Sequence, residues 1–142
     1  MIASSEGEFL LNGEVLIVED DDLLRNLMVE ILSDIGGGCV AFGTADDALI
    51  YLLRSHRDCT LLIADHGVPG QLLGSDLAKM VREKWPETAV ILTSGYELNP
   101  DDLPPKVRYL QKPWAVDSLI MVIDELVHQD NATLRPQQDR NS

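Results

Sequence analysis

Four short apolar runs are spread along the chain, and each is followed by residues that could take part in chemistry. The runs at 15–18, 61–64, 90–92 and 109–111 are followed by Glu19 and Asp20, by Asp65, by Thr93 and Ser94, and by Lys112 and Pro113, respectively. The first three runs are typical of strands in a parallel sheet that helices cover on both faces. Ligands of such sheets bind beyond the carboxyl ends of the strands. We therefore expect three carboxylates, a hydroxyl and an ammonium to meet at one edge.

Stretches with apolar residues at helical spacing alternate with these runs, at 24–32, 45–52, 77–85 and 119–127. The glycines at 36–38 favour a left-handed end to the first helix. Residues 40–42 resemble a further short strand, Thr44 and Ser75 are expected to cap the helices that follow them, and Pro86 ends the third helix. Strands that alternate with helices predict right-handed crossovers and a doubly wound α/β sheet.

Length and charge narrow the class of protein. The 142 residues, 45% of them hydrophobic, suit one globular domain, which we place at 14–128 between a flexible leader (1–13) and a flexible tail (129–142). The 24 acidic and 11 basic residues leave a net charge of -13, which disfavours direct binding to nucleic acid or anionic membranes. No signal peptide or membrane-length apolar run is evident, so we expect a cytoplasmic protein.

The two cysteines do not indicate a metal centre. Cys39 and Cys59 lack both the spacing and the histidine partners of a zinc site. Two cysteines in such a chain are more typical of small buried apolar side chains than of a disulfide.

The acidic residues at the strand ends point to a hard cation. Oxygen ligands with room for water favour Mg²⁺ over Ca²⁺ or zinc. A carboxylate beside Mg²⁺ can act as a nucleophile on phosphorus, while the metal and an ammonium such as Lys112 neutralise the developing charge. A simpler interpretation is that the acidic run, which continues through Asp21 and Asp22, only caps the first helix. The appearance of Asp65, Ser94 and Lys112 after separate apolar runs argues against it.

Between residues 14 and 128 the chain resembles the receiver domain of two-component response regulators. The matching residues are Glu19 and Asp20 for the acidic pair, Asp65 for the phosphoacceptor, Gly67 for the backbone-carbonyl metal ligand, Ser94 for the hydroxyl residue, Tyr109 for the aromatic switch, and Lys112 with Pro113 for the lysine and its cis bond. The sequences at 68–70, 93–96 and 110–113 are most similar to receivers attached to hybrid sensor histidine kinases. The resemblance implies a flavodoxin-like parallel sheet of five strands in the order 2-1-3-4-5 with helices on both faces.

The resemblance also implies a function. A stand-alone receiver takes a phosphoryl group from the phosphohistidine of a sensor histidine kinase or histidine phosphotransfer protein onto Asp65, with Mg²⁺ as cofactor, and is no enzyme beyond this self-phosphotransfer and autodephosphorylation. It signals through an unknown downstream protein, acts as a phosphate sink or serves as a relay, as a monomer or weak homodimer. One alternative is a binding module of receiver fold that is never phosphorylated. An aspartate-nucleophile phosphatase needs a second acid two residues after the nucleophile, where this chain has Gly67.

The chain departs from the family between Ser94 and Lys112. Most receivers carry a full helix between Ser94 and Lys112, whereas this segment contains Pro100, Pro104 and Pro105, so we expect the fourth helix to be short or absent. Two further residues bear on the lifetime of a phosphoryl group on Asp65. Gly67 leaves space beside that group, whereas Tyr96 is bulky enough to obstruct an attacking water.

Overall fold

The computed structural model describes residues 13–54, 59–95, 97–99, 101, 103 and 106–134, with side chains placed as far as Leu126. The predicted leader lies almost entirely outside the described residues, and α5 continues into the segment predicted as a tail. Within the described ranges, no helix is long and apolar enough to span a bilayer.

The core of the molecule is a parallel sheet. Its strands are β1 (Glu14–Val18), β2 (Gly38–Phe42), β3 (Cys59–Asp65), β4 (Ala89–Ser94) and β5 (Val107–Gln111), arranged in the order β2-β1-β3-β4-β5. The predicted topology is therefore confirmed. The strands β2, β3 and β5 begin about two residues earlier than their apolar runs, because pairing with a neighbouring strand depends on backbone groups. Gly38 and Cys59, the first residues of β2 and β3, both pair with Glu14 of β1.

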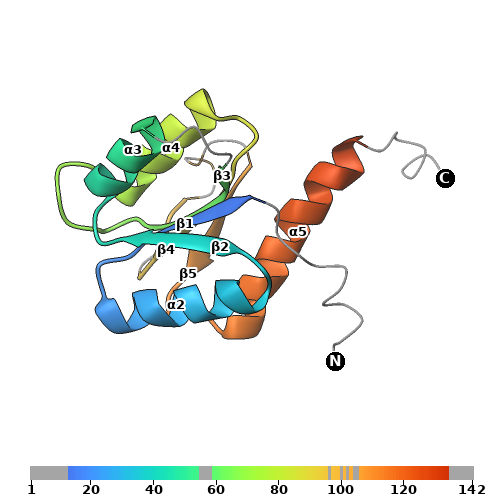
Figure 1. Cartoon of the computed structure of the whole chain (residues 1–142), viewed down its shortest axis with the longest axis horizontal. Helices are drawn as coiled ribbons and strands as arrows, with labels where there is room; N and C mark the ends of the chain where they lie inside the picture. Colours follow the sequence, from blue (N-terminus) through green and yellow to red (C-terminus); the bar gives the residue numbers. More distant parts are fainter. Residues whose placement is uncertain are drawn as a thin grey trace.

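Helices cover both faces of the sheet. They are α2 (Asp22–Asp34), α3 (Ala45–Arg54), α4 (Gly74–Lys84) and α5 (Val116–Leu134), with α2 and α5 on one side and α3 and α4 on the other (Figure 1). Two apolar clusters fill the layers. One joins Met28, Leu32, Leu119 and Ile123 to Val15, Ile17, Leu61, Ile63 and Ile91, and the other joins Ala48, Leu52, Leu77 and Val81 to Leu16, Val18, Leu62, Val90 and Leu92. The three central strands are buried on both faces, as predicted.

The ends of α2 show why it starts and stops where it does. The Asp21 carboxylate accepts a hydrogen bond from the Leu24 amide at 3.1 Å and caps the helix. At the other end Gly36 has a φ of 88°. The Gly36 amide donates to the Ser33 carbonyl and the Gly37 amide to the Leu32 carbonyl, the pairing of a Schellman motif. The predicted glycine stop is confirmed.

Of the two predicted helix caps, one is confirmed and one is wrong. The Thr44 hydroxyl accepts a hydrogen bond from the Asp47 amide at 3.1 Å. Ser75 instead lies inside the first turn of α4, because that helix begins at Gly74 with Leu73 as its N-cap. The Asp76 carboxylate accepts a hydrogen bond from the Leu73 amide at 3.0 Å, so an acidic side chain from within the helix satisfies the amide of the N-cap residue.

The segment between β4 and β5 departs from the helix–strand alternation. None of its described residues lies in an α-helix, and Asp101 lies in a short 3₁₀ turn. Lys106, directly before β5, has a φ of 69°. The prediction that the fourth helix is short or absent holds for the described part of this segment, while Pro100, Pro104 and Pro105 lie outside it.

Candidate phosphoacceptor site

The carboxyl ends of four strands meet at one edge of the sheet. Asp65 and Ser94 are the last residues of the neighbouring strands β3 and β4. Glu19 directly follows β1, and Lys112 directly follows β5. The parallel register therefore gathers the four predicted positions at the same edge.

Three carboxylates cluster at this edge. Oxygen atoms of Glu19, Asp20 and Asp65 all lie within 4.8 Å of one another. Their exposure differs, because Glu19 is buried, Asp65 is half-buried and Asp20 faces solvent. Like charges at such distances repel unless a cation joins them, and Asp20 and Asp65 remain accessible to one.

Lys112 lies between two of the carboxylates. Its Nζ atom donates to Glu19 Oε1 at 2.9 Å and to Asp65 Oδ2 at 3.2 Å. The Lys112 amide donates to the Ser94 carbonyl at 2.7 Å, and the Lys112–Pro113 peptide is cis. Burial lowers the pKa of the Lys112 ammonium, but the hydrogen bonds and charges of Glu19 and Asp65 outweigh it, so the net shift is upward. Lys112 is therefore a fixed positive charge.

Glu19 is held on all sides. Its amide donates to the Phe42 carbonyl at 2.9 Å, its Oε2 atom accepts from the Asp21 amide at 3.1 Å, and Lys112 holds Oε1. Burial raises the pKa of the Glu19 carboxyl, against the lowering effects of its bonds to Lys112 and to the Asp21 amide. Asp21 caps α2 while Glu19 and Asp20 belong to the carboxylate cluster, so one acidic run supplies both a helix cap and two members of the cluster.

Close backbone contacts hold the loop after β3. The Gly67 amide donates to Asp65 Oδ1 at 3.3 Å, and the His66 amide donates to the Thr93 carbonyl at 2.8 Å. A Cβ atom on Gly74 would lie 2.0 Å from the Asp65 carbonyl oxygen, so only glycine fits there. A Cβ atom on Gly67 would meet nothing within 4 Å, which agrees with open space beside Asp65.

The two predicted switch residues lie near the site in different settings. Ser94 is buried, with 2% of its surface exposed. Tyr109 is half-buried and interacts with the backbone of Leu98; burial and then the Glu97 carboxylate raise the pKa of its phenol. Tyr109 thus faces the segment between β4 and β5. Tyr96, predicted to affect the lifetime of a phosphoryl group, lies outside the described residues.

Sequence reasoning missed two residues of this edge. Arg25 donates through Nη1 to the Glu19 carbonyl at 2.8 Å, and Gly74 lies against the Asp65 carbonyl. A glycine at the start of a helix and an arginine three residues after Asp22 are both common, so neither carries a local signal. Only the packing of α2 and α4 against the strand ends identifies them.

The chemistry of these donors fits a magnesium ion. The clustered oxygens are carboxylates without nitrogen or sulfur, and the exposure of Asp20 leaves room for the waters that Mg²⁺ retains. Lys112 balances one of the three charges, which leaves a net negative charge of a size that a divalent cation neutralises.

Comparisons with known proteins agree with this geometry. The family model of the response regulator receiver domain matches residues 15–124. The hydrogenase transcriptional regulatory protein HoxA of Cupriavidus necator is 32% identical over 80% of this chain and 24% of its own length. The regulator NtrC of Proteus hauseri is 28% identical over 81% of this chain and 24% of its own. The chain thus spans about a quarter of these relatives.

Solved structures show the same fold. The receiver domain of the hybrid histidine kinase CckA is 28% identical with a TM-score of 0.69, and the superposition covers 81% of this chain and 99% of that one. A CheY-like receiver from Methanospirillum hungatei has a TM-score of 0.73 at 23% identity, covering 84% and 97% of the two chains. With the sheet order, the strand-end residues and the family model in agreement, this chain belongs to the response regulator receiver domain family.

Proposed function

We propose that this chain accepts a phosphoryl group on Asp65 from a phosphohistidine, with Mg²⁺ as cofactor, and passes the signal to a partner protein. The observation that carries the proposal is the position of Lys112, whose Nζ atom contacts both Asp65 and the buried Glu19. An ammonium at this place would neutralise charge on a phosphoryl group beside Asp65.

The transfer step follows from the chemistry of the donor. An Asp65 carboxylate oxygen attacks phosphorus, the phosphorus–nitrogen bond breaks, and the leaving imidazole nitrogen keeps the bonding electron pair. Catalysis of such a step depends on positioning and charge neutralisation. Lys112 supplies one positive charge, and a Cβ atom on Gly67 would meet nothing within 4 Å, which supports open space for the incoming group beside Asp65.

The cation would be held by Glu19, Asp20, Asp65 and the backbone carbonyl of Gly67. When bound, Mg²⁺ would neutralise charge on the phosphoryl oxygens. Glu19 already accepts two hydrogen bonds, from Lys112 and from the Asp21 amide. We therefore assign the more accessible carboxylates, Asp20 and Asp65, the larger share of direct contact with the ion.

The partners follow from the chemistry of the donor and acceptor. A sensor histidine kinase or a histidine phosphotransfer protein would supply the phosphohistidine, and a further protein would recognise the phosphorylated surface. Since such donors are made with ATP, the proposal places the reaction in the cytoplasm. Ser94 and Tyr109 would couple the phosphoryl group to that surface, through the segment that Tyr109 contacts at Leu98.

Intact-mass spectrometry after incubation with Mg²⁺ and acetyl phosphate tests the proposal. We expect the mass to increase by that of one phosphoryl group. No increase should occur when the metal is chelated before acetyl phosphate is added. The Asp65→Asn variant should gain nothing, because an amide is neither nucleophilic nor anionic. Uptake by this variant, or none by the unaltered protein, would contradict the proposal. Binding of beryllofluoride with Mg²⁺ would separate a working acceptor from a receiver fold that never meets phosphate.

A further inference from the structure

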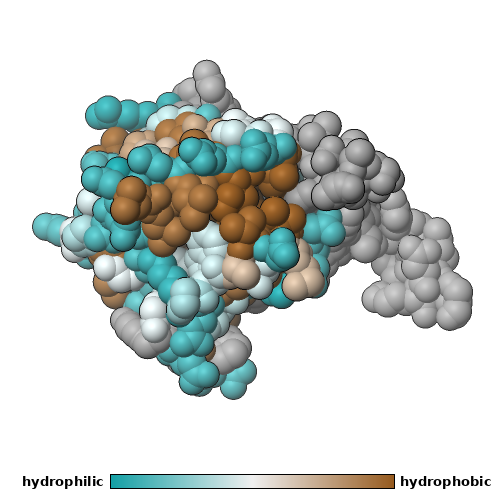
Figure 2. All heavy atoms as spheres, turned by 90° about the horizontal axis from the view of Figure 1, so that it is seen from below, coloured by the Kyte–Doolittle hydropathy of each residue, from teal (hydrophilic) through white to brown (hydrophobic). Residues whose placement is uncertain are grey.

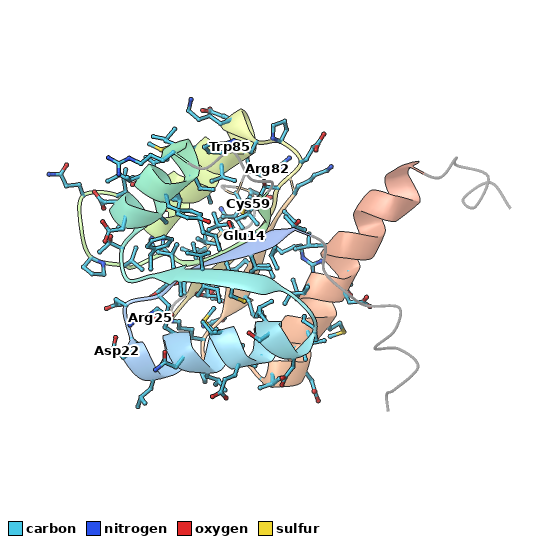
Figure 3. The ribbon with its side chains drawn as sticks, viewed as in Figure 1. Glu14, Asp22, Arg25, Cys59, Arg82 and Trp85 are labelled. Atoms are coloured by element: carbon cyan, nitrogen blue, oxygen red, sulfur yellow. The ribbon has the colours of Figure 1, made fainter. Side chains whose placement is uncertain are left out.

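Arg25 joins the first turn of α2 to the end of β1, next to the acidic cluster. Its Nη1 atom donates to the Glu19 carbonyl oxygen at 2.8 Å, and Nη2 forms an ion pair with Asp22. A Cβ atom on Gly43 would lie 3.8 Å from Nη1, so the guanidinium also lies against the turn after β2. Figure 3 shows Arg25 and Asp22 together where α2 begins.

The two contacts of Arg25 differ in their surroundings. The Arg25 side chain is 24% exposed, whereas the Asp22 side chain is 80% exposed. Exposed ion pairs contribute little. The bond to the Glu19 carbonyl is partly buried and satisfies an acceptor beyond the last strand residue, and hydrogen bonds from charged donors are stronger than neutral ones. Of the two contacts of Arg25, the hydrogen bond to the Glu19 carbonyl is therefore the one that contributes more to local stability.

That bond fixes the backbone that carries Asp20. The Glu19 carbonyl and the Asp20 amide belong to one planar peptide unit. The other groups of Glu19 are held by the Phe42 carbonyl, Lys112 and the Asp21 amide. With the carbonyl held as well, the plane of the Glu19–Asp20 peptide is fixed, and the bond from the Asp21 amide to Glu19 Oε2 holds the next peptide. The backbone is therefore restrained on both sides of Asp20, which limits the directions that its exposed carboxylate can take.

We propose that Arg25 is a positioning residue for the magnesium site, acting through the Glu19–Asp20 peptide rather than through its charge. This inference rests on the proposed function, since it concerns the cation that Asp65 would need. Positioning and charge predict opposite outcomes. An arginine near a cation site repels the cation, so its removal would strengthen Mg²⁺ binding if charge dominated. If positioning dominates, removal of Arg25 weakens Mg²⁺ binding instead.

Titration with Mg²⁺ in the absence of any phosphodonor tests the inference, with isothermal calorimetry as readout. We expect Arg25→Ala to weaken Mg²⁺ binding about tenfold, as is usual for groups that orient metal ligands. Arg25→Lys retains a donor and the charge, and should restore most of the affinity. Asp22→Ala removes only the exposed ion pair and should change the affinity less than about twofold.

Two controls separate this role from general stability. Arg108→Ala removes another arginine–carboxylate pair, to Glu125 at 2.8 Å and away from the acidic cluster, and should leave Mg²⁺ binding unchanged. Amide exchange without metal gives a second readout. Exchange at Asp20 and Asp21 should accelerate in Arg25→Ala but not in Asp22→Ala, while exchange in the core strands is unchanged in both.

The outcomes are distinct. Unchanged or tighter Mg²⁺ binding by Arg25→Ala, with normal binding by the unaltered protein, would overturn the positioning role and leave the proposed function standing. Equal weakening in Arg25→Ala and Arg108→Ala would also overturn it, because the effect would then reflect stability. Absence of Mg²⁺ binding by the unaltered protein would overturn the proposed function and this inference together.

Discussion

At the scale of single residues, Lys112 decides how the acidic edge of the sheet is tolerated. It pairs with Glu19, which is 1% exposed, and with Asp65, which is 12% exposed. A buried carboxylate without a partner is costly, so Lys112 supports the folded state as well as the proposed chemistry. The same contacts raise the pKa of its ammonium and keep it charged at neutral pH.

We predict that Lys112→Ala slows phosphoryl uptake about a hundredfold, a common effect of removing one charge-stabilising group. Structural change should also become uncoupled from phosphorylation. The rate is measured by intact mass during incubation with acetyl phosphate and Mg²⁺. Lys112→Arg keeps the charge, so its rate of phosphoryl uptake should fall less. An unchanged rate in Lys112→Ala would refute the assigned role.

Cys59 leads to a prediction about alkaline stability. Burial raises the pKa of its thiol from 9.0 to about 11. The folded protein therefore keeps this proton in a range where the unfolded chain has released it, and stability falls as pH rises from about 9 to about 11. The loss from this group reaches at most about 2.7 kcal/mol, two pH units at 1.36 kcal/mol each.

Urea unfolding at several pH values between 8 and 11 tests this prediction. Cys59→Ala should show a shallower loss of stability with pH than the unaltered protein, whatever its stability at pH 8. Cys39→Ala retains Cys59, so its stability should still show the part of the alkaline loss that is due to Cys59. Parallel slopes for Cys59→Ala and the unaltered protein would show that the thiol does not contribute.

At the scale of elements, the start of α4 is built against the end of β3. The Gly74 amide donates to the His66 carbonyl at 3.0 Å, and the space for a Cβ at Gly74 is taken by the Asp65 carbonyl. This contact sets the short path of the loop that contains Gly67. Packing of α4 and the position of the phosphoacceptor are therefore linked.

We predict that Gly74→Ala lowers the free energy of unfolding by about 3 kcal/mol, the upper range for overpacking, because backbone must move. Phosphoryl uptake should fall with it. Gly38→Ala is the matched control, since a Cβ there meets nothing within 4 Å. The midpoints of urea unfolding compare the stabilities of the two variants. Equal midpoints would contradict the close approach at Gly74.

The described residues of the segment between β4 and β5 depart from the alternation of helices and strands. A cavity of about 200 Å³ lies between α4 and this segment, lined by Ser75, Lys79, Leu92, Leu98 and Leu103. The cavity leaves room for the segment to shift. None of its described residues lies in an α-helix, so a signal that passed from Ser94 and Tyr109 to these residues would act on non-helical backbone.

We predict that beryllofluoride with Mg²⁺ orders or shifts residues 95–109. Amide exchange in this segment should become slower, while exchange in β1 and β3 changes little. The Asp65→Asn protein, treated in the same way, serves as the control. Fast exchange in both states, or a regular helix at 100–107, would contradict the prediction.

At the scale of the whole molecule, the net charge opposes self-association, whereas exposed apolar side chains favour it. A net charge of -13 makes copies of the chain repel one another. An apolar band nevertheless shows in the view of Figure 2, from the side of α2 and α5. On these helices Leu23, Leu27 and Met121 are exposed by 83%, 42% and 55%.

We predict a monomer or a weak homodimer, with α2 or α5 in any interface. Sedimentation equilibrium with beryllofluoride and Mg²⁺ measures the association. If a dimer forms, Leu27→Glu or Met121→Glu should weaken it. Ile50→Glu, on α3 across the sheet, is the control with a similarly exposed side chain. A dimer sensitive only to Ile50→Glu would refute this placement.

The sequence alone determined the sheet, its order through the family resemblance, and most of the site. Asp65, Ser94 and Lys112 were identifiable because each stands at the carboxyl end of an apolar strand or directly after it, and in parallel strands the position along the chain sets the edge that a residue reaches. Glu19 was identifiable for the same reason. Boundaries were less accurate, as the early start of β5 shows, because ladder hydrogen bonds do not depend on side-chain polarity.

Only the tertiary structure decided the roles that depend on contacts between distant segments. The short distance from Gly74 to the Asp65 carbonyl, the bond from Arg25 to Glu19 and the division of one acidic run between a helix cap and a carboxylate cluster leave no local pattern. Ser75 shows the converse, since its local pattern indicated a cap, yet α4 begins at Gly74 and its N-cap is Leu73. Apolar periodicity encodes which face is buried, whereas the partner of each polar group depends on which elements pack together.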